Sequence, residues 1–212
     1  MLLMRFSQAY MPIGIALMLL IGASSYALYH KDMTSSKPLA SVISSTPEAT
    51  STLTLSSPAF TDGASIPATY TCDGDGSLSP TLRISGVPAG AKSLALIVGD
   101  PDIPAAVKSQ LPDDAGGVYV HWIVFNIAAT TTEIKAGETP GVLGANGSDR
   151  NAYTGPCPPR QYMPNEHRYY FTLYALDTEL PLSPGASRAQ VLSAMVDHIL
   201  AETTLLGRYQ RL

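Results

Sequence analysis

The sequence predicts a mainly β domain with a sandwich core, closed by a C-terminal α-helix. Three segments rich in β-branched and aromatic residues have the length of strands, and one helix signature stands near the C-terminus. Gly and Pro, 17 of each, supply many turns, while the charged fraction of 14% is too low for long exposed helices. The 212 residues suit one domain with a substantial core.

The strongest strand candidates are apolar segments that alternate little between apolar and polar residues. They span residues 94–98, 119–127 and 168–176. Such strands are typical of a sandwich core, where both faces of a sheet are covered. Shorter pieces at 53–55 and 82–84 are expected to complete the sheets.

The helix signature begins at Ser187, which is followed by Gln190 at capping-box spacing. Val191, Met195 and Ile199 then recur at helical spacing, and Gly207 is the expected stop. We expect this helix to lie on a sheet.

Two connections are long and irregular, at residues 103–118 and 140–166. Loops of this length inside a compact domain are usually functional or mobile. We therefore expect a site on a β scaffold to be built beside them.

Residues 1–27 are expected to be a signal peptide or a membrane anchor. Arg5 precedes the apolar run 11–21, small residues follow, and a cut after Ala27 satisfies the small-x-small rule. The alternative is an uncleaved anchor, because residues 9–29 approach the roughly 20 residues that span a bilayer.

Residues 28–52 are rich in Ser, Thr and Pro and are expected to form a flexible tether. The folded domain should then span residues 53–212. We expect the protein to be exported to the periplasm or the extracellular space, and to stay tethered to the membrane if its N-terminal segment is uncleaved. The net charge of −4, without a basic cluster, argues against nucleic acid as a partner.

Polar residues that carry chemistry gather where predicted strands begin or end. Asp100 and Asp102 follow the first strong strand, in the Pro-stiffened run DPDIP. His121 and His167 lie near the starts of the other two, and Tyr169 shares the strand face of His167. Each has a plain structural explanation by itself, such as a partly buried strand histidine or an aspartate that caps its own turn.

Taken together, four motifs in order resemble the phosphatidylethanolamine-binding protein family. They are DPDIP at 100–104, HWIVFN at 121–126, GPCPP at 155–159 and HRY at 167–169. YTCDG at 70–74, SP at 79–80 and ALD at 175–177 are similar to its bacterial Raf-kinase-inhibitor-like branch, of the YbhB/YbcL type. The resemblance covers residues 53–212.

The resemblance implies a two-sheet antiparallel β-sandwich with an anion-binding pocket at one end. The ligand-binding residues that it implies are Asp100, Asp102, His121, Cys157, Pro158, His167 and Tyr169. Two features depart from the family pattern: Cys157 stands where eukaryotic members have Gly, and the segment 160–166 is longer and less Gly-rich than expected.

The expected ligand is a small anion or zwitterion, such as a phosphate head group. Imidazole and phenol groups donate hydrogen bonds to phosphate oxygens. Asp100 has the wrong charge for that task, but it can orient His121 or share a proton with a phosphate monoanion, whose next pKa is ~6. Binding should then weaken as the pH rises above neutrality.

No cofactor or metal ion is expected, because the sequence has no Gly-x-Ser-x-Gly nucleophile elbow, no Walker phosphate-binding loop and no recognised spacing of metal ligands. Enzymatic activity is left undecided, with binding as the first interpretation. The alternatives are a hydrolase acting on a phosphate or ester in the same pocket, and a protein-interaction or inhibitor module with a vestigial pocket. The sequence identifies no protein partner.

Cys72 and Cys157 are the only cysteines, and an even number in an exported chain favours a disulfide between them. The alternative is a pair of buried free thiols, since the bacterial branch keeps both cysteines in cytoplasmic members as well. A free Cys157 thiol would be the nucleophile of the hydrolase alternative.

Overall fold

Two antiparallel sheets and two short α-helices make up the part of the chain that the computed structural model describes, residues 52–111 and 116–211. The mainly β class is confirmed. The predicted leader 1–27 and nearly all of the predicted tether lie outside these residues. No helix in the described ranges has the length and apolar character needed to cross a membrane.

The larger sheet has the strand order β6-β4-β3-β7-β8, and every neighbouring pair is antiparallel. Its strands are β3 (Ser93–Asp100), β4 (Tyr119–Ala128), β6 (Val142–Leu143), β7 (Glu166–Leu176) and β8 (Ile199–Gln210). Val98 on β3 pairs with Trp122 on one side and Phe171 on the other. The three strong strand candidates are therefore the three central strands.

The smaller sheet is also antiparallel and has the order β1-β2-β5. Its strands are β1 (Thr54–Ser56), β2 (Leu82–Ser85) and β5 (Glu133–Ile134). Outside the sheets lie a 3-10 helix (Ala68–Tyr70), α1 (Ala105–Lys108) and α2 (Arg188–Met195). The two long connections expected to be irregular thus contain α1 and β6.

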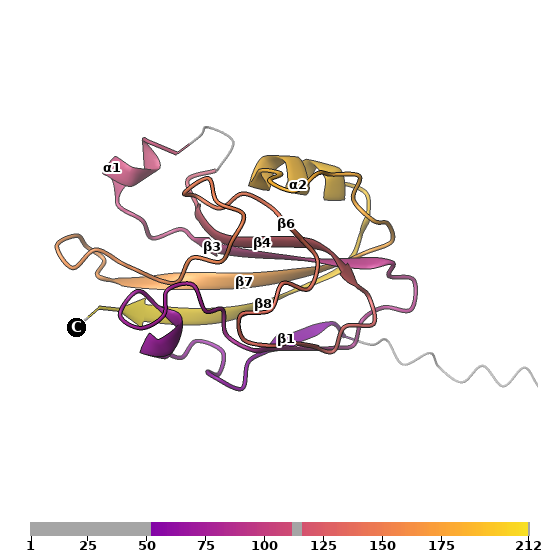
Figure 1. Cartoon of the computed structure of the whole chain (residues 1–212), viewed down its shortest axis with the longest axis horizontal. Coiled ribbons are helices and arrows are strands. Elements are labelled where there is room, and N and C mark those ends of the chain that lie inside the picture. Colours follow the sequence, from indigo (N-terminus) through magenta and orange to yellow (C-terminus); the bar gives the residue numbers. More distant parts are fainter. Residues whose placement is uncertain (1–51, 112–115, 212) are drawn as a thin grey trace, which may run out of the picture. The chain divides into compact units, whose positions relative to one another are not determined.

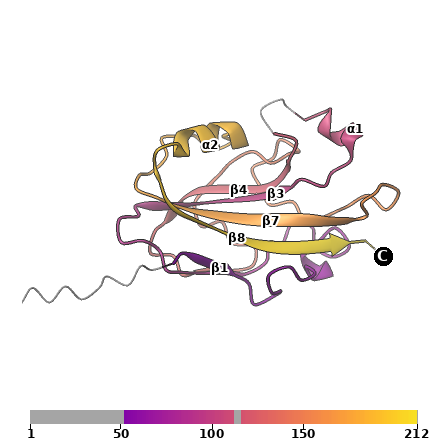
Figure 2. The ribbon, with the colours of Figure 1, turned by 180° about the vertical axis from the view of Figure 1, so that it is seen from behind.

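The larger sheet is covered on both faces (Figures 1 and 2). On one face, Trp122 and Phe171 pack in a core that includes Leu55 and Ile84 of the smaller sheet. On the other face lies a second core, and its members from the sheet and α2 include Ile97, Phe125, Val191 and Met195. Burial on both faces explains why β3 and β4 are continuously apolar, whereas β7 alternates between buried and half-buried residues.

The expected C-terminal helix is shorter than its sequence pattern suggests. The capping box at Ser187 and Gln190 is present, but α2 ends at Met195, and Asp197 adopts a positive φ of 65°. From Ile199 the chain forms β8, an edge strand of the larger sheet. Hydrogen bonding along the whole length of β7 outweighs the helical spacing, so Gly207 is a strand residue and the helix is not C-terminal.

Candidate functional site

The strand order brings the predicted polar residues to one end of the larger sheet. β3 lies between β4 and β7 and runs antiparallel to both. The end of β3, at Asp100, is therefore beside the beginnings of β4 and β7, where His121 and His167 lie. Residues far apart in the sequence meet because the sheet is antiparallel.

Asp100 is the centre of this group, and only 2% of its surface is exposed. His167 Nδ1 donates a hydrogen bond of 2.7 Å to its Oδ2, and the backbone N–H of Asp102 donates one of 2.8 Å to its Oδ1. His121 Nε2 lies 4.0 Å from the same Oδ2. The second bond is made inside the Pro-stiffened turn, so the turn fixes the orientation of the carboxylate.

His121 is held in one tautomer by the loop that faces it. Its Nδ1 lies 2.6 Å from the carbonyl oxygen of Thr154. A carbonyl only accepts, so Nδ1 carries the proton and Nε2 of the neutral ring is an acceptor. Burial lowers the pKa of His121 and outweighs the opposing influence of Thr154 and Asp100. The ring is therefore neutral at physiological pH.

A cavity of about 210 Å³ opens over these groups. Its polar base is formed by Asp100, His121 and His167, and most of its wall is apolar. The wall residues are Ile103, Pro104, Val107, Tyr119, Thr154, Gly155, Cys157, Pro158 and Pro159. The site is thus a small hollow with a charged base.

The structure brings five of the seven predicted site residues to this cavity: Asp100, His121, Cys157, Pro158 and His167. Asp102 is outside the lining, because its carboxylate accepts from the backbone N–H, Nε and Nη2 of Arg168 at 2.9, 2.8 and 2.7 Å. The hydrogen bonds from Arg168 lower the pKa of Asp102. Asp102 fixes the turn to β7.

Tyr169 is likewise outside the lining and only 1% exposed. It contacts His121 edge to face, with the ring centroids 5.1 Å apart. Burial raises the pKa of its phenol. Tyr169 Oη and His167 Nε2 are buried atoms without a hydrogen-bond partner among the described residues. Tyr169 therefore supports His121 from the core side.

Several lining residues were not among the predicted ones. Ile103 and Pro104 lie inside the DPDIP motif, and Thr154 directly precedes GPCPP, so extending the motifs would have found them. Tyr119 lies two residues before His121 on the same strand face, and its ring contacts that of His121 with the centroids 4.9 Å apart. No motif in the sequence indicated Val107, which lies on α1, outside the strand-end motifs.

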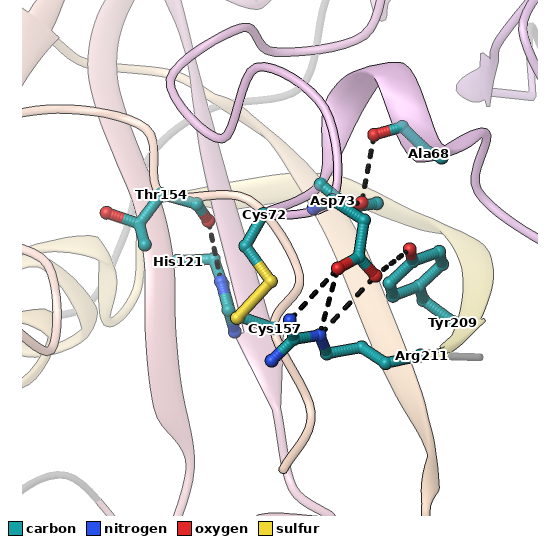
Figure 3. The surroundings of a disulfide bond; sticks show 9 residues. Ala68, Cys72, Asp73, His121, Thr154, Cys157, Tyr209 and Arg211 are labelled. Atoms are coloured by element: carbon teal, nitrogen blue, oxygen red, sulfur yellow. Dashed lines mark hydrogen bonds and ion pairs between the residues drawn. A yellow bond between two sulfur atoms is a disulfide. The ribbon is translucent and has the colours of Figure 1, made fainter. Parts of the chain in front are cut away.

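The two cysteines form a disulfide beside the cavity (Figure 3). Because the Cys157 sulfur is bonded to Cys72, it is not a thiol in this structure. The nucleophile considered for the hydrolase alternative is therefore blocked. Among the described residues, no group of three or more His, Cys, Asp or Glu is placed to hold a metal ion.

The chain is thus a two-sheet antiparallel sandwich with a buried carboxylate and two histidines at one end. Residues 56–210 match the model of the phosphatidylethanolamine-binding protein family. A Chlamydia pneumoniae protein of the UPF0098 group is 45% identical over 158 residues, which cover 74% of this chain and 98% of the relative. The chain belongs to the phosphatidylethanolamine-binding protein family.

Solved structures of two bacterial family members have the same fold. The homologue CT736 of Chlamydia trachomatis is 40% identical, with a TM-score of 0.69, and the match covers 76% of this chain and 99% of that one. Escherichia coli YbcL, described as a member of the mammalian family, is 28% identical, with a TM-score of 0.64 and the same coverage. These similarities agree with the bacterial branch suggested by the motifs.

Proposed function

We propose that this protein is exported and binds a small phosphate-bearing or zwitterionic head group in the cavity at the end of the larger sheet. One observation carries the proposal: Asp100, His121 and His167 converge at the base of a cavity of about 210 Å³. Family membership supports it, since the family is named for a phospholipid whose head group combines a phosphate with an amine.

The protonation of these groups restricts the ligand. The described residues that line the cavity include no Lys or Arg, so the cavity offers a phosphate no fixed positive charge. Asp100 Oδ2 and the neutral His121 Nε2 are acceptors, so a ligand must bring a proton with it. A phosphate monoanion does so through its P–OH, and an ethanolamine does so through its ammonium.

Calorimetric titration with phosphoethanolamine and with inorganic phosphate, from pH 5 to pH 8, tests this proposal. Phosphate affinity should fall as the pH rises, because the monoanion loses its proton with a pKa of ~6. Phosphoethanolamine should keep part of its affinity, because its ammonium remains charged. Phosphate affinity that is flat or rises with pH contradicts proton sharing.

Two variants locate the binding. Asp100→Asn and His121→Ala should each weaken phosphoethanolamine binding by roughly tenfold or more, as expected for the loss of a buried hydrogen-bonding group. His198→Ala is the matched control, because His198 is exposed and outside the cavity. Full binding by both cavity variants would favour the protein-interaction alternative, and turnover of a phosphate or ester substrate that His167→Ala abolishes would favour the hydrolase.

Export is the second part of the proposal. The N-terminal segment has the charged, apolar and small-residue order of a secretory signal, and disulfides persist in oxidising compartments. Mass spectrometry of the mature protein distinguishes cleavage near Ala27 from an intact anchor. A soluble cytoplasmic protein that retains Met1 would contradict export.

A further inference from the structure

The disulfide lies exposed in the wall of the candidate ligand cavity. Cys72 and Cys157 are both exposed residues, and Cys157 lines the cavity. The bond joins the segment that follows the 3-10 helix to the cavity loop, residues 154–159 (Figure 3). Small thiols therefore have access to a bond that belongs to the binding site.

The second half of the cavity loop depends on this bond for its position. The first half is held by backbone hydrogen bonds, from Thr154 N to His121 O at 2.9 Å and from Gly155 N to Gly76 O at 2.7 Å. Pro158 and Pro159 have no N–H, and Cys157 N makes no backbone hydrogen bond within the described residues. Besides a long hydrogen bond of 3.4 Å from Tyr162 N to Pro159 O, this half is held by the packing of the buried Pro158 and by the disulfide.

The Cys72 side of the bond is anchored independently. Besides a backbone hydrogen bond from Cys72 N to Pro156 O at 3.0 Å, which joins it to the first half of the cavity loop, this segment has contacts of its own with the region of β8. The neighbouring Asp73 accepts from Tyr209 Oη at 2.6 Å and from Arg211 Nε at 3.1 Å, which ties this segment to the end of β8 (Figure 3). These two hydrogen bonds lower the pKa of Asp73, so its carboxylate is charged at neutral pH. Cleavage should therefore release the Cys157 side.

We infer that the Cys72–Cys157 bond is a thiol–disulfide exchange site, and that its reduction by a dithiol opens the cavity wall. A thiolate of the dithiol attacks one sulfur, the bond between the cysteines breaks, and the other cysteine leaves as a thiolate. The second thiolate of the dithiol attacks the mixed disulfide and releases the first cysteine. The dithiol loses two electrons and becomes a disulfide, and the cysteine thiolates take protons from water.

Reduction should weaken ligand binding, a consequence that rests on the proposed function. Cys157 and Pro158, in the second half of the loop, line the cavity. Once this half is loosened the cavity widens, and a ligand must order the wall again when it binds, which costs free energy. We expect affinity for phosphoethanolamine to fall roughly five- to tenfold on reduction, a typical coupling between two sites.

The experiment compares the full-length oxidised protein with the protein reduced by dithiothreitol without denaturant. Amide hydrogen exchange by NMR reports on the loop, and calorimetry reports on phosphoethanolamine binding. The Cys72 amide, which donates to Pro156 O beside the disulfide, should exchange faster after reduction, while the amides of β3 keep their protection. The Cys72→Ser/Cys157→Ser double variant should resemble the reduced protein and not respond to dithiothreitol.

Three outcomes would overturn the inference: a disulfide that resists dithiothreitol in the folded protein, unchanged exchange at the Cys72 amide, or equal loss of protection in β3, which would mean global unfolding. If the double variant does not fold, the comparison of oxidised and reduced wild type decides alone. If the oxidised protein does not bind phosphoethanolamine, the proposed function fails, and amide exchange still tests the exchange site.

Discussion

The carboxylate of Asp100 is buried at a place where an isolated charge would cost several kcal/mol. Hydrogen bonds from His167 and from the backbone of Asp102 offset part of that cost. The third neighbour, His121, is prevented from adding a positive charge by its own burial, which lowers its pKa. A buried carboxylate beside a neutral His121 is therefore the arrangement that the cavity stabilises.

Because His121 is buried in its neutral form, it should make the stability of the fold depend on pH in the acid range. The pKa of His121 is lower in the folded protein than the value of 6.5 for the unfolded chain, so the unfolded chain binds the proton more readily. The contribution of neutral His121 to the free energy of unfolding is complete above pH 6.5. It is lost as the pH falls toward the lower pKa that His121 has in the folded protein. His121→Asn keeps a donor for Thr154 and removes the titration. The free energy of unfolding should therefore fall less between pH 7 and pH 5 in the variant, as measured by urea unfolding.

The control for this measurement is His198→Asn, at an exposed histidine paired with Asp177. If it flattens the pH profile as much as His121→Asn does, burial of His121 is not the cause. Wild type and His121→Asn with equal losses of stability would contradict the prediction as well.

At the scale of elements, β8 shows how pairing overrides a local pattern. The strand pairs with β7 from Glu166 to Leu176, and Leu205, Gly207 and Tyr209 alternate toward the core. A Cβ at Gly207 would come within 2.6 Å of Ile66 and 3.1 Å of Phe60. Glycine is required here by close packing, and its φ is not in the left-handed region that a helix stop needs.

Gly207→Ala should therefore destabilise the domain. Overpacking a filled core costs about 1–3 kcal/mol, which urea unfolding resolves. Gly90→Ala is the matched control, because its Cβ would make only an ordinary contact of 3.6 Å with Leu200. A Gly207 variant as stable as the Gly90 variant would show that the strand can move away from Ile66.

Local sequence predicted the central strands, because β3 and β4 are buried on both faces and so are apolar throughout, and because β7 is rich in aromatic residues. It could not predict β8, because the helical spacing of Val191, Met195 and Ile199 extends to the first residue of that strand, and only pairing with the edge of β7 shows that the helix has ended. The site was predicted by motifs at strand ends. Asp102 does not line the cavity because it pairs with Arg168, and Tyr169 does not because it lies below His121 in the core. Neither fact can be inferred from the face of the strand on which a residue lies.

For the whole molecule, a second sheet of three short strands is enough to complete the sandwich. β1 has three residues, yet Leu53 and Leu55 beside and within it are 4% and 7% exposed and belong to the core between the sheets. The Chlamydia pneumoniae relative matches over 98% of its own length but over only 74% of this chain. A chain consisting almost entirely of the matching region is therefore sufficient for a family member.

We accordingly expect a shortened chain that begins at Thr52 to fold and to unfold in urea with the free energy of the full chain, within about 0.5 kcal/mol. A second shortened chain that begins at Ser57 lacks β1 and with it Leu53 and Leu55. Each buried leucine that is lost costs about 2–5 kcal/mol, so this chain should be severely destabilised. Equal stability of both shortened chains would mean that β1 is dispensable. Loss of stability already at Thr52 would place part of the folded domain before the predicted boundary at residue 53.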